Sequence, residues 1–173
     1  MKDITDKNFG VIIAFLIPGF MLLWGLSYSS SMVAAWLVKS SAADAPTVGG
    51  FLYATLASLA LGLLISAIRW FFVDHFLYYF TCLKQTKVDF SKLKTKEAFA
   101  AFEGVVENHY RYYQYYSNTF VAVVISFAAY LWAGKDTSSK TVIFGVILLC
   151  VVLLLASRDC LKKYHERAAE IAS

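Results

Sequence analysis

Length, composition and charge already exclude several classes of protein. The chain has 173 residues, of which 59% are hydrophobic and 17% aromatic, and its formal net charge is +4 at pH 7. Soluble domains are typically about 45–50% apolar, and a soluble fold this small would have to expose large apolar patches. An ordinary soluble domain is therefore excluded, and we expect a single all-α domain embedded in the lipid bilayer.

Four apolar stretches are candidate transmembrane helices, because about 20 helical residues cross a hydrocarbon core of ~30 Å. They are residues 9–28, 48–73, 119–133 and 141–156. The first stretch is uncharged and longer than the core of a typical signal peptide, so we expect an uncleaved anchor. Pro18 and Gly19 predict a kink inside it, since proline removes a backbone hydrogen bond; the kink is either a packing feature or a gating hinge.

The distribution of basic residues predicts the orientation of these spans. Basic side chains are concentrated in the segment 75–117 and in the tail 158–173, whereas the two loops on the opposite side contain few. The two basic regions hold Lys84, Lys87, Lys92, Lys94, Lys96 and Arg111, and then Arg158, Lys162, Lys163 and Arg167. By the positive-inside rule, both termini and the central segment face the cytoplasm in a multi-pass protein of the cell inner (plasma) membrane.

Small residues mark the helix interfaces, because helices in lipid associate where side chains permit close approach. The second and third spans each carry such a stripe, whereas the fourth is mostly aliphatic and suits lipid exposure. We therefore expect spans two and three to be the closest pair, joined either within one chain or between the protomers of a homo-oligomer. An alternative is a narrow polar path along the serines. The stripes are Gly50, Ala54, Ser58, Gly62 and Ser66, and then Ala122, Ser126 and Ala129.

The segment between spans two and three predicts one long helix. Thr95 is a plausible helix N-cap, Glu97 suits the first turn, and apolar residues follow at spacings of three and four. We expect a continuous helix from Thr95 to Ala133, roughly 55–60 Å long, which extends the third span into the cytoplasm. Such a helix would project from the membrane and contact a protein partner there.

The most unusual string runs from Glu107 to Asn118 and contains five tyrosines. One interpretation is an aromatic belt at the membrane interface with a Glu107–Arg111 ion pair at i,i+4. The other is a polar cluster at the cytoplasmic mouth of a pore or cleft, in which Arg69 pairs with Glu107 or with the competing Asp74. The cluster comprises Arg69, Asp74, Glu107, Asn108, Arg111 and Gln114.

Five lysines precede and begin the long helix. They predict contact with anionic lipid, at about 1 kcal/mol for each basic residue near the surface, or with a cytoplasmic partner. Nucleic acid is the less expected partner, because no nucleic-acid motif accompanies the charge. The five are Lys84, Lys87, Lys92, Lys94 and Lys96.

No motif predicts an enzyme, a metal site or a cofactor. Phosphate loops, dinucleotide fingerprints and zinc signatures are absent from the sequence, and the cysteines Cys82, Cys150 and Cys160 have no paired-ligand spacing. Arg69 with His75, and Arg158 with His165, match the loose Arg-x(4–6)-His signature of HEPN ribonucleases. Such a match arises by chance in roughly a fifth of comparable sequences, so we expect no catalytic residues.

Length, four spans, a basic cytoplasmic segment and these Arg–His pairs resemble a known class of protein. The chain is similar to small multi-pass membrane accessory proteins of prokaryotic anti-phage loci, beside RNA-targeting CRISPR effectors or in deaminase operons. The resemblance implies an oligomer that disrupts or monitors the inner membrane during infection, and it assigns no residue. Two functions follow: an oligomeric effector or pore-like accessory protein, or a non-conducting scaffold that tethers a cytoplasmic partner through residues 84–117.

Overall fold

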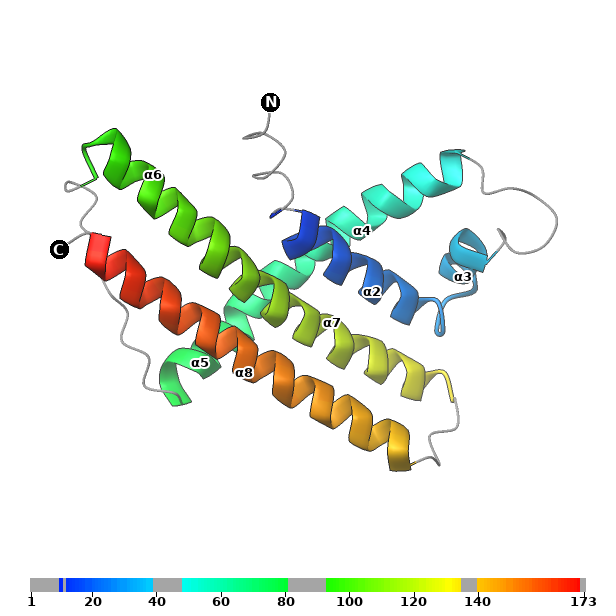
Figure 1. The fold of residues 1–173 in the computed structure, drawn as a ribbon. Helices are drawn as coiled ribbons and strands as arrows, with labels where there is room; N and C mark the ends of the chain where they lie inside the picture. The colour runs from blue at the N-terminus through cyan, green and yellow to red at the C-terminus, as the bar shows by residue number, and fades with distance from the viewer. Residues whose placement is uncertain (1–9, 11, 39–47, 81–92, 135–139, 172–173) are drawn as a thin grey trace.

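The computed structural model describes residues 10, 12–38, 48–80, 93–134 and 140–171. The regular structure of these residues is helical and includes no strand, so the predicted all-α class is confirmed (Figure 1). In chain order the elements are η1 (Ile12–Leu16), α2 (Ile17–Leu26), α3 (Ser31–Val38), α4 (Val48–Arg69), η2 (Trp70–Asp74), α5 (His75–Phe80), α6 (Lys96–Val105), η4 (Val106–Tyr110), α7 (Arg111–Trp132) and α8 (Lys140–Ile171), where η denotes a π-helical turn.

The long helix predicted from Thr95 to Ala133 is present as α6, η4 and α7 in succession. Thr95 caps it as expected, because its Oγ1 accepts a hydrogen bond from the backbone N–H of Ala98 at 3.2 Å. At the other end Gly134 takes a φ of 66°, a left-handed conformation that glycine adopts without strain and that stops the helix. The cap and the terminal glycine explain why both ends were predictable.

The closest helix crossings involve α2, where glycines let backbones touch. A Cβ atom on Gly19 would lie 1.8 Å from the carbonyl oxygen of Ser58 in α4, and one on Gly62 would lie 2.0 Å from the carbonyl oxygen of Phe15. The prediction that spans two and three form the closest pair is therefore wrong. The Ser58–Gly62 part of the stripe packs on the first helix of the same chain, because that helix also presents small residues.

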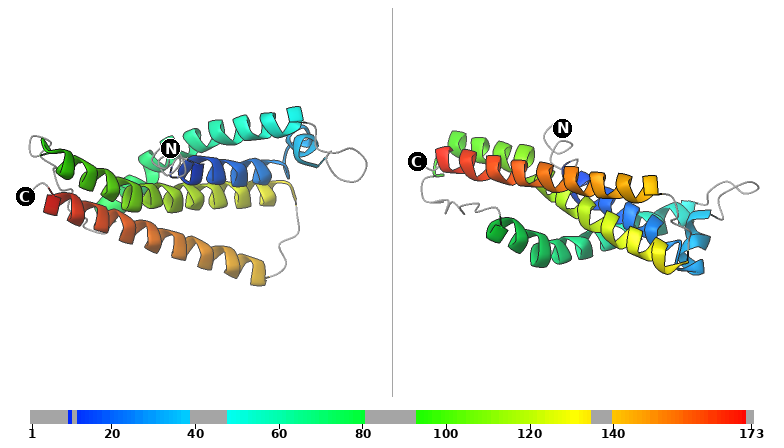
Figure 2. Two further views of the ribbon diagram at one scale, coloured as in Figure 1. Left: turned by 45° about the horizontal axis from the view of Figure 1, so that its top comes forward. Right: turned by 90° about the horizontal axis from the view of Figure 1, so that it is seen from below.

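Helix α8 packs against the long helix mainly through its C-terminal half. Its buried residues are Leu153, Ser157, Leu161 and Ala168, whereas most of residues 140–152 are exposed. Figure 2 shows the N-terminal end of α8 diverging from α7, while its C-terminal end runs beside α6. The end of α8 and α6 thus form a two-helix arm, which we define as residues 96–110 with 158–171.

Two helices of the described chain are long and apolar enough to cross a membrane. They are Gly50–Tyr79, which spans α4 to α5, and Lys140–Ile171, which is α8. The apolar helix Ile12–Leu26 is shorter. The predicted third span, residues 119–133, is the shortest of the four apolar stretches and follows the polar residues 107–118. Its length and composition alone therefore do not qualify it as a membrane-crossing helix.

Candidate functional site

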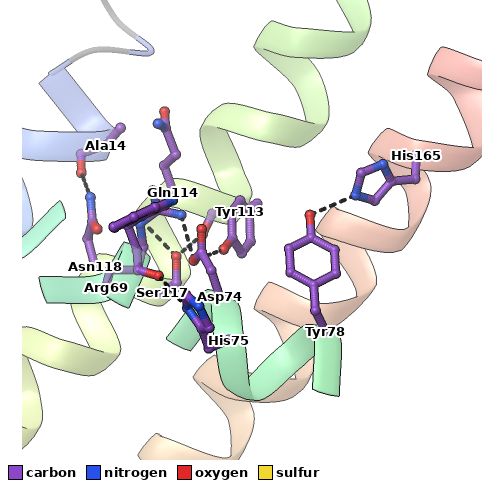
Figure 3. A network of polar contacts seen from close by, with 11 residues as sticks. Ala14, Arg69, Asp74, His75, Tyr78, Tyr113, Gln114, Ser117, Asn118 and His165 are labelled. Carbon is purple, nitrogen blue, oxygen red and sulfur yellow. Dashed lines mark hydrogen bonds and ion pairs between the residues drawn. The ribbon is translucent and has the colours of Figure 1, made fainter. Parts of the chain in front are cut away.

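The proline of the first helix is accompanied by a polar contact deep in the bundle. Pro18 has no N–H to donate to the carbonyl of Ala14, four residues earlier, and Ala14 lies in the π-helical turn η1. Asn118, which is fully buried on α7, donates from its Nδ2 to that carbonyl at 2.8 Å (Figure 3). The side chain thus replaces the backbone donor that proline lacks. The proline in the sequence indicates that the Ala14 carbonyl lacks a backbone donor, but it does not indicate which side chain supplies one.

The centre of the site is an ion pair between Arg69 and Asp74. Arg69 Nη1 donates to Asp74 Oδ1 at 3.2 Å, and the whole Arg69 residue is 4% exposed. Tyr113 of α7 donates from its hydroxyl to the same carboxylate oxygen, and the guanidinium carbon lies 5.0 Å from the centre of its ring. The side chain of Tyr113, on the long helix, therefore contacts both the Arg69 and the Asp74 charge.

The π-helical turn η2 makes this pairing possible. Arg69 and Asp74 are five residues apart, a spacing that α-helical geometry does not bring onto one face. Because Trp70–Asp74 is π-helical, the turn is wider and returns Asp74 toward Arg69. Turns of this kind occur frequently at functional sites.

A second ion pair lies on the long helix itself. Arg111 Nε donates to Glu107 Oε1 at 3.4 Å, and Arg111 Nη1 donates to Gln114 Oε1 at 3.2 Å. A Cβ atom on Gly10 would lie 2.5 Å from Glu107 Oε2. Gly10 therefore lies directly against this pair.

The predicted polar cluster is thus only partly one site. Arg69 pairs with Asp74, the competing partner, and not with Glu107, because η2 holds Asp74 close to it. Glu107, Arg111 and Gln114 form their own group, as the alternative interpretation of an i,i+4 pair expected. Asn108 is exposed. The strongest contact, from Tyr113 to Asp74, was not predicted, since its tyrosine is one of five in a single string.

Several buried polar atoms have no hydrogen-bond partner in the described part of the chain. Buried polar atoms are normally bonded to protein or to ordered water. The surroundings of Arg69 and Asn118 therefore have the donors and acceptors to hold water. The atoms are Ser58 Oγ, Arg69 Nε, Asn118 Oδ1, Thr119 Oγ1, Ser157 Oγ and His165 Nδ1.

A third contact joins α5 to the arm. Tyr78 Oη lies 2.9 Å from His165 Nε2, and the Tyr164 ring stacks at 5.0 Å on Tyr110 of η4. Burial lowers the pKa of His165 below its ordinary value near 6.5. The neutral imidazole is therefore the form that this contact favours. Its partner could not be read from the sequence, because 87 positions separate the two residues.

The Arg–His pairs are occupied by other contacts. Arg69 belongs to the ion pair above, and the Nδ1 of exposed His75 lies 3.4 Å from the carbonyl oxygen of Trp70. Arg158 is exposed and His165 is half-buried, about 10 Å apart along the helix axis. In the described residues no group of three or more His, Cys, Asp or Glu is placed to hold a metal ion.

The remaining predicted site residues are dispersed. Ser58, Gly62 and Ala122 are buried, and Ser126 donates to the carbonyl of Met21 at 3.2 Å. Because Ser58 is covered by α2, a polar path along the serines of span two does not open within one chain. The other residues of the stripes are half-buried: Gly50, Ala54, Ser66 and Ala129. Two of the five lysines, Lys94 and Lys96, are exposed. The described residues do not include Lys84, Lys87, Lys92 or Cys82.

An apolar cleft of about 390 Å³ lies between α2, α7 and the N-terminal half of α8. Trp24, Tyr28, Tyr130 and Val146 are among the residues that line it. The lining is mainly apolar and aromatic, and the described residues that form it include no charged side chain.

Comparison of the chain with family models, with curated proteins and with solved structures gave no match.

Proposed function

We propose that the protein is an oligomeric membrane effector, or pore-like accessory protein, in which the arm controls the membrane helices. The single observation that carries the proposal is the Arg69–Asp74 pair closed by Tyr113. A buried ion pair has to be desolvated, which is costly, and an ionisable residue within a membrane helix is by default a candidate functional residue. Here it connects α4, which turns most of its surface outward, to the long helix that continues into the arm.

Four spans with both termini in the cytoplasm fit this proposal. Helices α4 and α8 have the length and apolarity for crossing, and the first helix and residues 119–133 would complete the set. The first helix fits against α4 and α7 at Gly19 and Gly25, where a Cβ atom would meet backbone atoms at 1.8 Å and 2.6 Å. Packing this close suits helices that cross together.

Oligomerisation is part of the same proposal, and the surface that α4 leaves free is where a second protomer would pack. Ser58, Gly62 and Ile65 are buried against the chain itself, whereas Leu56, Leu63 and Leu64 are each 55% exposed. The polar core is sealed within the protomer, so a conducting path would run between protomers. A particle image in detergent tests this directly: a closed ring with a central opening is expected, and a monomer would contradict it.

Membrane depolarisation tests the effector function. Cells that express the protein, with and without phage infection, are loaded with a membrane-potential dye. We expect depolarisation with the natural sequence and its loss in Asp74→Asn, which leaves Arg69 without its counter-ion. Glu166→Gln is the matched control, because Glu166 pairs only with exposed Lys162 at 3.6 Å. If the natural sequence depolarises no cells under either condition, the effector proposal fails.

A role in anti-phage defence belongs to the same proposal and rests on the resemblance of overall architecture. Plaque assays test it in a strain that carries the protein with its neighbouring genes. We expect fewer plaques than in a strain that carries Asp74→Asn. Equal plaque numbers in both strains would remove this part of the proposal.

A non-conducting scaffold is the second candidate, and the arm favours it. Lys163 and Asp159 pair at 2.6 Å, and Arg167 and Glu170 at 3.2 Å, so the outer face of α8 is charged and exposed. This surface, with Lys94 and Lys96, would suit a cytoplasmic protein. Purification from the native cell distinguishes the candidates: a scaffold retains a partner in stoichiometric amount, and recovery without any partner counts against it.

A further inference from the structure

The helix that begins in α4 is longer than a membrane crossing requires. Gly50–Tyr79 has 30 residues, about 45 Å at 1.5 Å per residue, whereas about 20 residues cross the hydrocarbon core. Counted from Gly50, about 20 residues bring the helix to Arg69, which is also its first charged residue. The segment Trp70–Tyr79 therefore begins where the hydrocarbon core ends.

This segment exposes aromatic rings in place of aliphatic side chains. Trp70, Phe71 and Phe72 are 62%, 61% and 63% exposed. On α8, by contrast, the exposed side chains are mainly aliphatic, such as Leu148 at 53% and Leu155 at 60%. Aliphatic side chains suit the hydrocarbon core, while tryptophan and tyrosine are enriched where lipid meets water.

The rings are not covered by the arm. The right-hand view in Figure 2 shows α5 separated from α6, and the three rings stay exposed although Tyr78 of the same segment contacts His165 of the arm. Val73 and Leu77 are buried on the opposite face, at 4% and 2% exposure. The segment thus has one side that packs on the bundle and one aromatic side turned outward.

We propose that η2 and α5 form an interfacial segment, which inserts Trp70, Phe71 and Phe72 into the headgroup layer of the bilayer. The excess helix length places the segment at this depth, and the aromatic composition matches it. Lys84 and Lys87 follow in the sequence, and their charge favours the same layer. The proposal requires membrane insertion, but it is independent of conduction and of oligomer number.

Depth-dependent fluorescence quenching tests the proposal. A protein with Trp70 as its only tryptophan, made by Trp24→Phe, Trp36→Phe and Trp132→Phe, is reconstituted in phosphatidylcholine vesicles brominated at known acyl positions. Flotation with the vesicles establishes insertion separately. We expect Trp70 to be quenched most by bromines nearest the headgroup. Stronger quenching by bromines near the chain ends, or quenching by aqueous iodide alone, would overturn the proposal.

Two further reporters guard against a misfolded variant and against another occupant. Phe72→Trp in a tryptophan-free background is expected to repeat the shallow pattern, and Leu148→Trp on α8 is expected to show the opposite, deep pattern. If a second copy of the chain covers the rings instead, lipid quenching of Trp70 will fall as the protein-to-lipid ratio rises. That outcome would also overturn the proposal.

Discussion

At the scale of single residues, the molecule depends on a few polar side chains that compensate for local defects. Asn118 supplies a hydrogen bond that Pro18 withholds, and Asp74 and Tyr113 enclose the charge of Arg69. Each compensation links two helices that are distant in sequence. Their removal should therefore weaken tertiary packing more than helix content.

The first prediction concerns Asn118 and Pro18. Asn118→Ala leaves the Ala14 carbonyl without its side-chain donor, and the free energy of unfolding in detergent should fall by about 1 kcal/mol. In a Pro18→Ala background the same substitution should cost less, because the residue at position 18 then has a backbone N–H for that carbonyl. A double-mutant cycle measures the difference. Strict additivity would show that the two residues do not share this carbonyl.

The second prediction concerns pH. Above about pH 6.5 the His165 ring is neutral in folded and unfolded chains alike. As the pH falls below 6.5 the unfolded chain binds a proton more readily, because burial lowers the folded-state pKa of His165. Stability should therefore decrease from about pH 7 to pH 5. In the protonated ring both nitrogens are donors, and Nδ1 has no acceptor in the described residues.

Thermal unfolding in detergent between pH 5 and pH 7.5 measures this dependence. His165→Gln, which stays neutral, should flatten the profile. His75→Gln serves as the control and should leave it nearly unchanged, because His75 is exposed. An unchanged slope in His165→Gln would assign the pH dependence to another group.

At the scale of helices, backbone contact at α2 determines the arrangement of the bundle. Gly19 faces Ser58 and Gly62 in α4, and Gly25 faces Ser126 in α7. Helix α2 therefore lies against both neighbours. Larger residues at these positions would push the helices apart, whereas a Cβ atom on Gly104 or Gly145 would have nothing within 4 Å.

The third prediction compares two glycine substitutions. Gly19→Ala places a Cβ atom 1.8 Å from a backbone oxygen, so α2 and α4 must separate, and stability should fall by about 1–3 kcal/mol. Gly104→Ala in α6 has nothing within 4 Å and should gain about 0.5–1 kcal/mol, since alanine is the better helix former. Thermal unfolding of the two variants decides: equal effects would contradict the contact at Gly19.

The elements were largely predictable from the sequence, but their pairing was not. The long helix was found to within a residue at each end, because Thr95 and the run up to Gly134 are local signals. The pairing of α4 with the first helix was missed: the stripe on α4 shows that something packs there, but not what. Gly19 and Gly25 are the signal that was overlooked, since small residues also mark the first helix.

The site shows the same limit. Glu107 with Arg111 is a local pair and was predicted, and Asp74 was correctly named as a possible partner of Arg69. The contact of Tyr78 with His165 depends on how α5 meets α8. No spacing in the sequence encodes that contact. Contacts that form only through tertiary packing were therefore not predicted from the sequence.

At the scale of the whole molecule, the open choice is between two and four membrane crossings. Two helices qualify by length and composition, and four apolar stretches fit the distribution of charge. The difference decides on which side of the membrane Lys94, at the start of the arm, lies relative to the tail. With four crossings Lys94 and the tail are on the same side, and with α4 and α8 alone they are on opposite sides.

The fourth prediction follows from this difference. Alkaline phosphatase inserted after Lys94 should be inactive, because we expect that segment in the cytoplasm. A green fluorescent protein fused after Ser173 should fluoresce in the same cells, because we expect the tail in the cytoplasm. An active phosphatase with a fluorescent tail would support two crossings and contradict four.

Three π-helical turns in the described residues, η1, η2 and η4, carry Ala14, Asp74 and Glu107, which take part in the polar contacts described above. Each accommodates one residue beyond the α-helical repeat, in effect a single-residue insertion held in a helix. If the insertion in Trp70–Asp74 were released, everything after it would rotate by about 100° and slide by about 1.5 Å. Asp74 would leave Arg69 and Tyr78 would leave His165 together. A one-residue shift of helical register would thus separate the Arg69–Asp74 pair and release α5 from the arm, without unwinding a helix.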